Sequence, residues 1–383
     1  MTTTFDSRLL GCLLGVAIGD GMGGPVEGLT ATEIQRRFPT WDWTRFLPTQ
    51  EWKPKGEGRI TDDTLMTEAL IRAYHAAGTH LDAFGFRDFL LPEMCDHPVW
   101  VPERQQDMVI IDRLNFLEKY VQIRLRMASA EPRIAGVGNG LNCAIAMFIM
   151  PVGAVNAGDP HAAYHEAAEL GMAESHSYAV EGAAALAAAY AAALARDATV
   201  DTVLESARTH AREGTRAAIT AAIAASDPAD PLDRWIAKVL AAVQPFNQSP
   251  TGASVLEEDP ALRSPNVADP RLAFEEVPVA LAALKWGQGD FLRTLEASVR
   301  FGRDCDSIAG MACGLCGALV GRAGIPDALA LTSAEANRRN WMAMAEEFAS
   351  TIRRLHAKDA ARWDAHCRTI LADGETGRRN RHD

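Results

Sequence analysis

Apolar residues recur every three or four positions along several long segments, as Leu65, Ala69 and Ala73 illustrate. This spacing places apolar side chains on one face of a helix. An alanine-rich segment, residues 180–194, favours a helix by propensity alone. No run of five or more residues alternates as a strand between two turn signals. The pattern therefore predicts an all-α fold, and the segments with helical spacing are residues 64–74, 105–127 and 341–355.

A proline-rich stretch, residues 245–278, interrupts the helical periodicity and predicts a long irregular connection. A domain boundary there is one interpretation. We favour a single domain over residues 1–375, because two acidic motifs on opposite sides of this stretch make chemical sense only if they meet. The charged end of the chain, residues 376–383, is expected to be disordered.

Composition narrows the classes of function. The 383 residues are 48% hydrophobic and 23% charged, which is typical of a folded globular protein. The formal net charge of −12 repels phosphate backbones and anionic lipids, so neither nucleic acid nor a membrane is an expected partner. An acidic surplus can also reflect carboxylates gathered to hold cations.

The cysteines and the apolar runs bear on the cellular compartment of the protein. Seven cysteines, an odd number scattered over the chain, do not form a disulfide framework, and Cys313 and Cys316 are predicted to be core residues. Residues 9–18 lack the flanking charge and the cleavage site of a signal peptide. The other apolar runs, residues 141–155 and 182–195, are shorter than a membrane span needs. We therefore expect a cytoplasmic protein.

Two acidic motifs stand directly before predicted helices. Helix capping would explain either motif alone, since Asp, Ser and Thr suit helix N-termini. Together they supply four carboxylates and adjacent hydroxyls, an all-oxygen set suited to Mg²⁺ or Mn²⁺. Such carboxylates repel one another unless cations compensate them. The two motifs are Thr61-Asp62-Asp63-Thr64 and Asp304-Cys305-Asp306-Ser307.

Glycine spacing suggests that the two ends of the chain meet. Glycine inside a helix costs up to about 1 kcal/mol relative to alanine, so glycines that line one face need a reason such as close backbone approach. If the two glycine faces pack together, Asp20 and Glu27 come near Asp304 and Asp306; the alternative is that each face packs elsewhere. The two sets are Gly11, Gly15 and Gly19 in the first helix, and Gly310, Gly314, Gly317 and Gly321 in the helix after Ser307.

Five ordered segments resemble the ADP-ribosylglycohydrolase family, which includes the dinitrogenase reductase-activating glycohydrolases and the J1 crystallins. The resemblance extends from Gly11 to about Pro326 and therefore covers most of the chain. Its segments are GCLLGVAIGDGMGGPVE (11–27), ITDDT (60–64), GVGNG (136–140), ESH (174–176) and GRDCDSIAGMACGLCGALVG (302–321).

The resemblance implies a compact orthogonal bundle of helices and a hydrolase that cleaves a ribosyl glycosidic bond at a centre of two divalent cations, Mg²⁺ or Mn²⁺. The implied metal ligands are Thr61, Asp62, Asp63, Asp304, Asp306 and Ser307. The implied catalytic residues are Glu27, Asp62 and Asp63. The implied substrate-binding residues are Gly138, Asn139, Gly140, Ser175 and His176.

The expected chemistry follows from charge. Breaking a bond at the anomeric carbon of ribose builds positive charge, which surrounding carboxylates stabilise. Metal ions can hold the 2- and 3-hydroxyls and lower the pKa of a bound water that attacks this carbon. Glu27 or Asp62 could accept the proton.

One departure from the family affects the expected substrate. Relatives that bind ADP-ribose typically have a glycine-rich loop between the TDDT and GNG motifs, whereas residues 86–135 contain no glycine. The aromatic residues Trp100, Phe116 and Tyr120 predict a wall suited to a base or a small aglycone. The alternatives to an ADP-ribosylated substrate are therefore a smaller nucleoside- or nucleotide-like riboside, and a catalytically inactive relative like the crystallins.

Two further sets of residues are weaker candidates. His161 and His165 have the i, i+4 spacing of helical metal ligands but lack a third ligand, so a solvated or capping role is favoured. Asp96, His97 and Trp100 could touch substrate, although loop residues of these types are usually surface residues.

Overall fold

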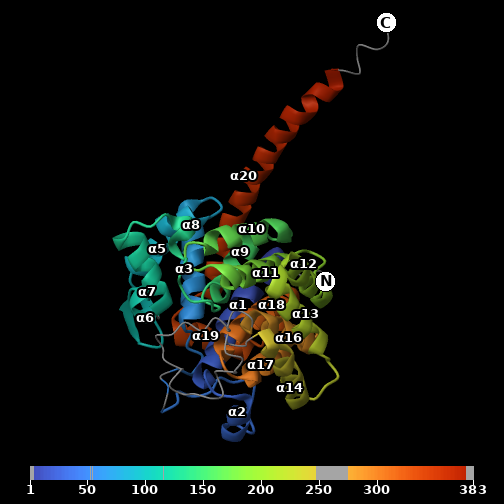
Figure 1. Cartoon of the computed structure of the whole chain (residues 1–383). Helices are drawn as coiled ribbons and strands as arrows, with labels where there is room; N and C mark the ends of the chain where they lie inside the picture. The colour runs from blue at the N-terminus through green and yellow to red at the C-terminus, as the bar shows by residue number, and fades with distance from the viewer. Residues whose placement is uncertain (1–3, 52, 54, 115, 247–274, 377–383) are drawn as a thin grey trace.

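The computed structural model describes residues 4–51, 53, 55–114, 116–246 and 275–376, without the side chains of residues 116–117 and 371–376. The described residues form a helical body from which one long helix projects (Figure 1). The all-α prediction is confirmed, since the strands found among the described residues are two short ones, β1 (Val99–Val101) and β2 (Gln106–Met108).

The described α-helices of the N-terminal half are α1 (Phe5–Gly23), α2 (Ala31–Arg37), α3 (Asp62–Ala77), α4 (Ala83–Gly85), α5 (Leu91–Cys95), α6 (Ile110–Arg113), α7 (Phe116–Gln122), α8 (Pro132–Ala135), α9 (Met150–Val155), α10 (Pro160–Gly171) and α11 (Ser177–Ala193). Those of the C-terminal half are α12 (Val200–His210), α13 (Glu213–Ala225), α14 (Leu232–Val243), α16 (Glu276–Gly287), α17 (Phe291–Phe301), α18 (Cys305–Val320), α19 (Asp327–Asn337) and α20 (Trp341–Thr376). Shorter 3₁₀ and π turns are η1 (Gly24–Val26), η2 (Phe86–Leu90), η3 (Ile123–Met127), η4 (Ala146–Phe148), η5 (Gln244–Phe246) and η8 (Arg322–Gly324).

Helices α1 and α18 form the centre of the fold and pack through their glycines (Figure 1). A Cβ atom added at Gly15 would lie 2.0 Å from the carbonyl oxygen of Cys313, and one at Gly19 would lie 2.2 Å from that of Ala309. A Cβ atom added at Gly11 would lie 2.3 Å from the carbonyl oxygen of Gly317. The predicted packing of the glycine faces is confirmed, and it is a backbone-to-backbone contact that no larger residue could make.

Other helices surround this pair and bury it. Helices α16 and α17 pack on α18, and α20 packs on α1. Segment Phe5–Val26 is long and apolar enough to cross a membrane, yet the whole of its most apolar window is buried inside the protein, as expected for a core helix. The hydrophobic core is one cluster that includes residues from both sides of segment 247–274, which itself lies outside the described residues.

The prediction of one helix over residues 105–127 is wrong. Residues 102–105 instead form a turn with Gln105 at a positive φ of 51°, and β1 and β2 pair across it. Three short helical pieces, α6, α7 and η3, follow. Ile110, Leu114 and Leu125 are buried, as the apolar spacing predicted. They lie along a series of short helical pieces after the turn and not on one continuous helix.

Helix α20 is longer than the predicted segment 341–355. Its part up to Leu355 packs on the body, whereas most of the residues after Leu355 are exposed on the projecting part (Figure 1). The predicted disordered tail falls largely on residues 377–383, which lie outside the described residues.

We predict that Gly15→Ala lowers the free energy of unfolding by about 1–3 kcal/mol or more, because the added Cβ would overlap the carbonyl of Cys313. Gly15→Leu should be more severe. Gly310→Ala is the matched control on the facing helix, since its Cβ would meet no atom closer than 3.7 Å. The control should be neutral or stabilising by up to about 1 kcal/mol, because alanine favours helix. Urea denaturation measures both, and equal effects of the two substitutions would contradict the packing argument.

Stability should also depend on pH through His80. Its Nδ1 lies 2.6 Å from Glu166 on α10 and its Nε2 lies 2.8 Å from Asp359 on α20. The hydrogen bond to Glu166, opposed by partial burial, raises the pKa of His80 to about 9. The stabilisation that protonated His80 gives the folded state is therefore fully present below a pH of about 6.5, the pKa of histidine in the unfolded chain. It is lost as the pH rises through 9.

We predict that His80→Gln lowers stability by on the order of 1–2 kcal/mol at pH 6 and has a smaller effect at pH 10. Solvent screens part of this interaction, because the His80 side chain is 29% exposed. His356→Gln, an exposed position on α20, is the control. Thermal unfolding across this pH range measures the difference, and a pH-independent effect of His80→Gln would contradict it.

Candidate metal and substrate site

Acidic residues gather where three chain segments meet beside the glycine contact. Asp20 lies near the end of α1, Asp63 lies in the first turn of α3, and Asp306 lies in the first turn of α18. A Cβ added at Gly23 would lie 2.5 Å from the Cα of Asp306, so the two segments touch here as well. Because α3 and α18 both begin at this point, the positive ends of two helix dipoles face the carboxylates.

The carboxylates form two overlapping groups. Oxygens of Asp20, Asp63 and Asp306 lie within 4.8 Å of one another, and so do oxygens of Glu27, Asp304 and Asp306. Asp306 belongs to both groups. The predicted convergence of Asp20 and Glu27 with Asp304 and Asp306 is therefore confirmed.

Asp20 fixes the start of α3. It is fully buried and accepts hydrogen bonds from the backbone N–H of Thr61 (2.9 Å) and from both the backbone N–H (3.2 Å) and the hydroxyl (2.5 Å) of Thr64. Burial, followed by the charge of Asp306, raises the pKa of Asp20 to about 7. Its contacts make Asp20 a positioning residue for the TDDT motif.

The donor set fits a hard divalent cation. One oxygen of Asp63 and one of Asp306 are buried and have no hydrogen-bond partner among the described residues. Burial and the neighbouring carboxylates raise the pKa values of Asp63, Asp304 and Asp306. Orphaned buried oxygens and mutual repulsion are the two conditions that a bound cation relieves.

Basic residues that the sequence analysis missed also enter this cluster. The Lys55 ammonium lies 2.5 Å from Glu27 Oε2 and 3.0 Å from Asp306 Oδ2, and Lys53 lies 2.7 Å from the same oxygen of Glu27. Burial opposes ionisation of Glu27, but Lys55 and Lys53 outweigh it and lower the pKa of this carboxyl. The sequence Lys53-Pro54-Lys55, shortly before the TDDT motif, was the signal that could have pointed to these lysines.

A third basic residue, Arg113, neutralises Asp62. Arg113 donates to Asp62 Oδ1 at 2.8 Å and also binds the buried Glu103. Asp62 and Asp63, adjacent in sequence, thus have different environments: Asp62 is paired with arginine, whereas Asp63 faces other carboxylates. Arg113 lies in α6, within the segment whose structure the sequence analysis predicted wrongly.

The acidic cluster lines a cavity of about 1140 Å³. The predicted residues that line it are Glu27, Asp62, Asp63, Asp304, Asp306 and Ser307, whereas Thr61 is buried behind them. The apolar wall consists of Met147, Ile236, Leu240 and Phe301. The cations among the lining residues are Arg36 and Arg303.

The prediction of an aromatic wall from the glycine-free segment is wrong for Trp100, which does not line this cavity. Its ring lies under Arg338 and its carbonyl accepts from Arg339. Tyr120 donates to the carbonyl of Val137, and the side chain of Phe116 lies outside the described residues. The segment contributes Glu118 to the lining.

The five predicted substrate-binding residues come together but bind mainly one another. Asn139 donates to the carbonyl of Glu174 (2.7 Å), Ser175 donates to that of Gly140 (2.8 Å), and His176 Nε2 lies 3.2 Å from the carbonyl of Asn139. Gly138 has a positive φ of 91°, which glycine adopts readily. None of the five lines the described cavity. The first residue after Gly140 that does line it is Asn142.

The weaker candidates have structural partners. His161 and His165 lie exposed on α10 with their Nε2 atoms 3.2 Å apart. Asp96 pairs with Arg126, and His97 lies 3.1 Å from Glu93. These residues do not line the cavity.

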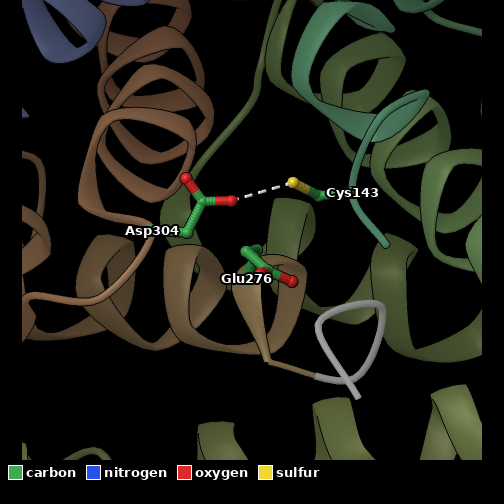
Figure 2. A group of neighbouring side chains, drawn as sticks. All are labelled: Cys143, Glu276 and Asp304. Carbon is green, nitrogen blue, oxygen red and sulfur yellow. Dashed lines mark hydrogen bonds between the residues drawn. The ribbon is translucent and has the colours of Figure 1, made fainter. Parts of the chain in front are cut away.

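A third group of metal-ligand type lies at the cavity wall and was also missed. Atoms of Cys143, Glu276 and Asp304 lie within 4.8 Å of one another (Figure 2). The Cys143 thiol donates to Asp304 Oδ2 at 3.1 Å. Glu276, in the first turn of α16, is completely buried.

Comparisons with known proteins agree with this fold. A sequence model of the family described as ADP-ribosylglycohydrolase matches residues 1–362, so the chain belongs to this family of glycosyl hydrolases. The chain is 31% identical over 143 residues to the ADP-ribosyl-[dinitrogen reductase] glycohydrolase of Rhodospirillum rubrum. That alignment covers 36% of this chain and 42% of the relative.

A solved structure shares the fold over nearly its full length. The chain from an ADP-ribosylglycohydrolase-related protein complex superposes with a TM-score of 0.58 at 20% identity, covering 91% of this chain and 99% of that one. The compact helical bundle is therefore the fold of this family, as the sequence motifs implied.

We predict that Lys55→Met destabilises the metal-free protein by about 3–5 kcal/mol, because removing one partner leaves buried carboxylates uncompensated. Mg²⁺ should raise the melting temperature of this variant more than that of the wild type, since the ammonium no longer competes for Glu27 and Asp306. Lys358→Met on α20 is the control. Equal Mg²⁺ shifts in all three proteins would show that Lys55 and the ion use different oxygens.

Proposed function

We propose that this protein is a divalent-metal-dependent hydrolase that removes ADP-ribose from a modified substrate by cleaving the ribosyl glycosidic bond. The observation that carries the proposal is the convergence of Glu27, Asp63, Asp304 and Asp306 at one wall of a large cavity, with buried oxygens that lack partners. Membership of the ADP-ribosylglycohydrolase family and the name of the Rhodospirillum relative support the substrate class.

The proposed cofactors are two divalent cations, Mg²⁺ or Mn²⁺. One would be held by Asp63 and Asp306 with Thr61 and Asp62, the other by Glu27, Asp304 and Asp306 with Ser307. When bound, such ions supply Lewis acidity and orient the ribose hydroxyls.

The chain's own residues supply the remaining chemistry. Glu27 is anionic at neutral pH because Lys55 and Lys53 lower its pKa, and it faces the cavity, where it can orient water. Asp62 also faces the cavity, held in place by Arg113. The surrounding carboxylates favour the positive charge that develops on the ribose ring as the glycosidic bond breaks.

The cavity accommodates an ADP-ribose unit. Its volume of about 1140 Å³ exceeds that of most small-ligand pockets. Arg36 lines the same cavity as the acidic cluster and provides a cation for a phosphate, whereas Arg303 is paired with Glu275. A smaller riboside is the second candidate, favoured by the glycine-free segment 86–135, which lacks the family's usual source of backbone donors for a pyrophosphate.

We predict that Asp63→Asn and Asp306→Asn each lower hydrolysis of ADP-ribosylated substrates by at least about 100-fold, with loss of metal binding but no loss of fold. The assay combines mass spectrometry of released ribose species with metal analysis of the reconstituted protein. Asp364→Asn, an exposed carboxylate on α20, is the control. Full activity after complete metal removal would contradict metal dependence, and a wild type that binds metal but cleaves nothing would favour the inactive, crystallin-like alternative.

Calorimetric competition at the metal site distinguishes the two substrate sizes. The size of the cavity and the presence of Arg36 predict that ADP-ribose binds the metal-loaded protein more tightly than ribose 5-phosphate or a nucleoside does. Arg36→Gln should lower the affinity for ADP-ribose and leave the affinity for a nucleoside unchanged. If a nucleoside or monophosphate competes at least as well as ADP-ribose, the smaller riboside is the substrate class.

A further inference from the structure

The group formed by Cys143, Glu276 and Asp304 differs chemically from the rest of the acidic centre because it contains sulfur. Cys143 lies in the loop after the GNG motif, Glu276 at the start of α16 and Asp304 at the start of α18 (Figure 2). Three separate segments thus direct one thiol and two carboxyl groups to one point.

Glu276 provides an independent reason to expect a ligand. It is 0% exposed, and neither carboxylate oxygen has a hydrogen-bond partner among the described residues. The neighbouring Glu275 has its own partner, Arg303, so the adjacent cation is already paired. A fully buried carboxyl without a partner is costly, and a bound cation would remove that cost.

The spacing of the three groups suits a tetrahedral ion. Metal bonds of about 2.3 Å to sulfur and about 2.1 Å to oxygen place two tetrahedral ligands about 3.6 Å apart. The Cys143 sulfur and Asp304 Oδ2 are 3.1 Å apart, and one oxygen of Glu276 lies within 4.8 Å of the sulfur and of an Asp304 oxygen. Side-chain movements of about half an ångström to about 1 Å would give ligation.

The donor set selects the kind of ion. A thiolate prefers softer transition metals such as Zn²⁺, Co²⁺ or Fe²⁺ over Mg²⁺. Cys143 and Asp304 line the cavity, whereas Glu276 does not, so the fourth position of the ion would open toward the cavity. Three protein ligands and one open position are typical of a zinc site that can bind a further molecule.

We propose that Cys143, Glu276 and Asp304 form a site for a thiophilic divalent cation, with Zn²⁺ as the expected ion, which adjoins the hard-cation centre and shares Asp304 with it. Binding forms a metal–sulfur bond and releases the thiol proton to solvent. Asp304 has two carboxylate oxygens and can therefore serve this site and the acidic centre together.

Cobalt titration of the intact protein tests the site, because thiolate ligation gives Co²⁺ a charge-transfer band in the near ultraviolet. We expect the wild type to give this band at one Co²⁺ per chain, and Cys143→Ser to abolish it. Glu276→Gln should weaken Co²⁺ binding at least tenfold while keeping the band at saturation. A large excess of Mg²⁺ should leave the band in place, and Zn²⁺ should displace Co²⁺ and remove it.

Matched controls exclude other thiols and unfolding. Cys95 and Cys367 are the free cysteines that are not buried, so Cys95→Ser and Cys367→Ser should keep the band. Circular dichroism checks the fold of each variant, and Glu276→Gln decides the outcome if Cys143→Ser does not fold. Absence of the band in the wild type, its survival in Cys143→Ser, or unchanged Co²⁺ affinity in Glu276→Gln would overturn the proposal, whatever the result of the hydrolysis assays.

Discussion

The close contact between α1 and α18 is the constraint on which the rest of the structure depends. At Gly15 and Gly19 the backbones approach so closely that even a methyl group would overlap a carbonyl. This contact aligns the end of α1 with the start of α18 and so brings Glu27 to Asp304 and Asp306. Close packing of small residues thus determines where the carboxylates lie, and the chemistry of the site follows from that arrangement.

The arrangement concentrates negative charge in a buried place, and the structure compensates it in several ways. Lys55 and Lys53 neutralise Glu27, and Arg113 neutralises Asp62. Asp20 is satisfied by the backbone and hydroxyl of the TDDT motif. Oxygens of Asp63, Asp306 and Glu276 have no hydrogen-bond partner in the part of the chain that the structure describes. This uneven compensation separates groups that stabilise the site from groups that are available to a ligand.

The buried carboxylates around the cavity differ in whether a sulfur atom lies beside them. Around Asp63 and Asp306 the donors are all oxygen, as hard cations prefer, whereas Glu276 shares its surroundings with the Cys143 thiol. Both groups adjoin the same cavity, whose lining includes Arg36 on α2, residues of η4 and α14, and Phe301 at the end of α17. The cavity therefore combines cation-binding groups with surfaces for a phosphate-bearing substrate.

The sequence by itself determined the helical class and the positions of the glycine faces and of most of the acidic residues, because each depends on local spacing that leaves a clear pattern, whereas the structure decided that the two glycine faces meet. Glycines every four residues and Asp pairs at helix starts are of this kind. It did not determine the break at Gln105, the position of Trp100 away from the cavity, or the entry of Lys55 and Arg113 into the cluster. These features, like the meeting of Cys143 with Glu276, depend on contacts between residues far apart in the chain. Only the tertiary structure could decide them, because helical periodicity records which face of a segment is buried but not which side chains it meets there.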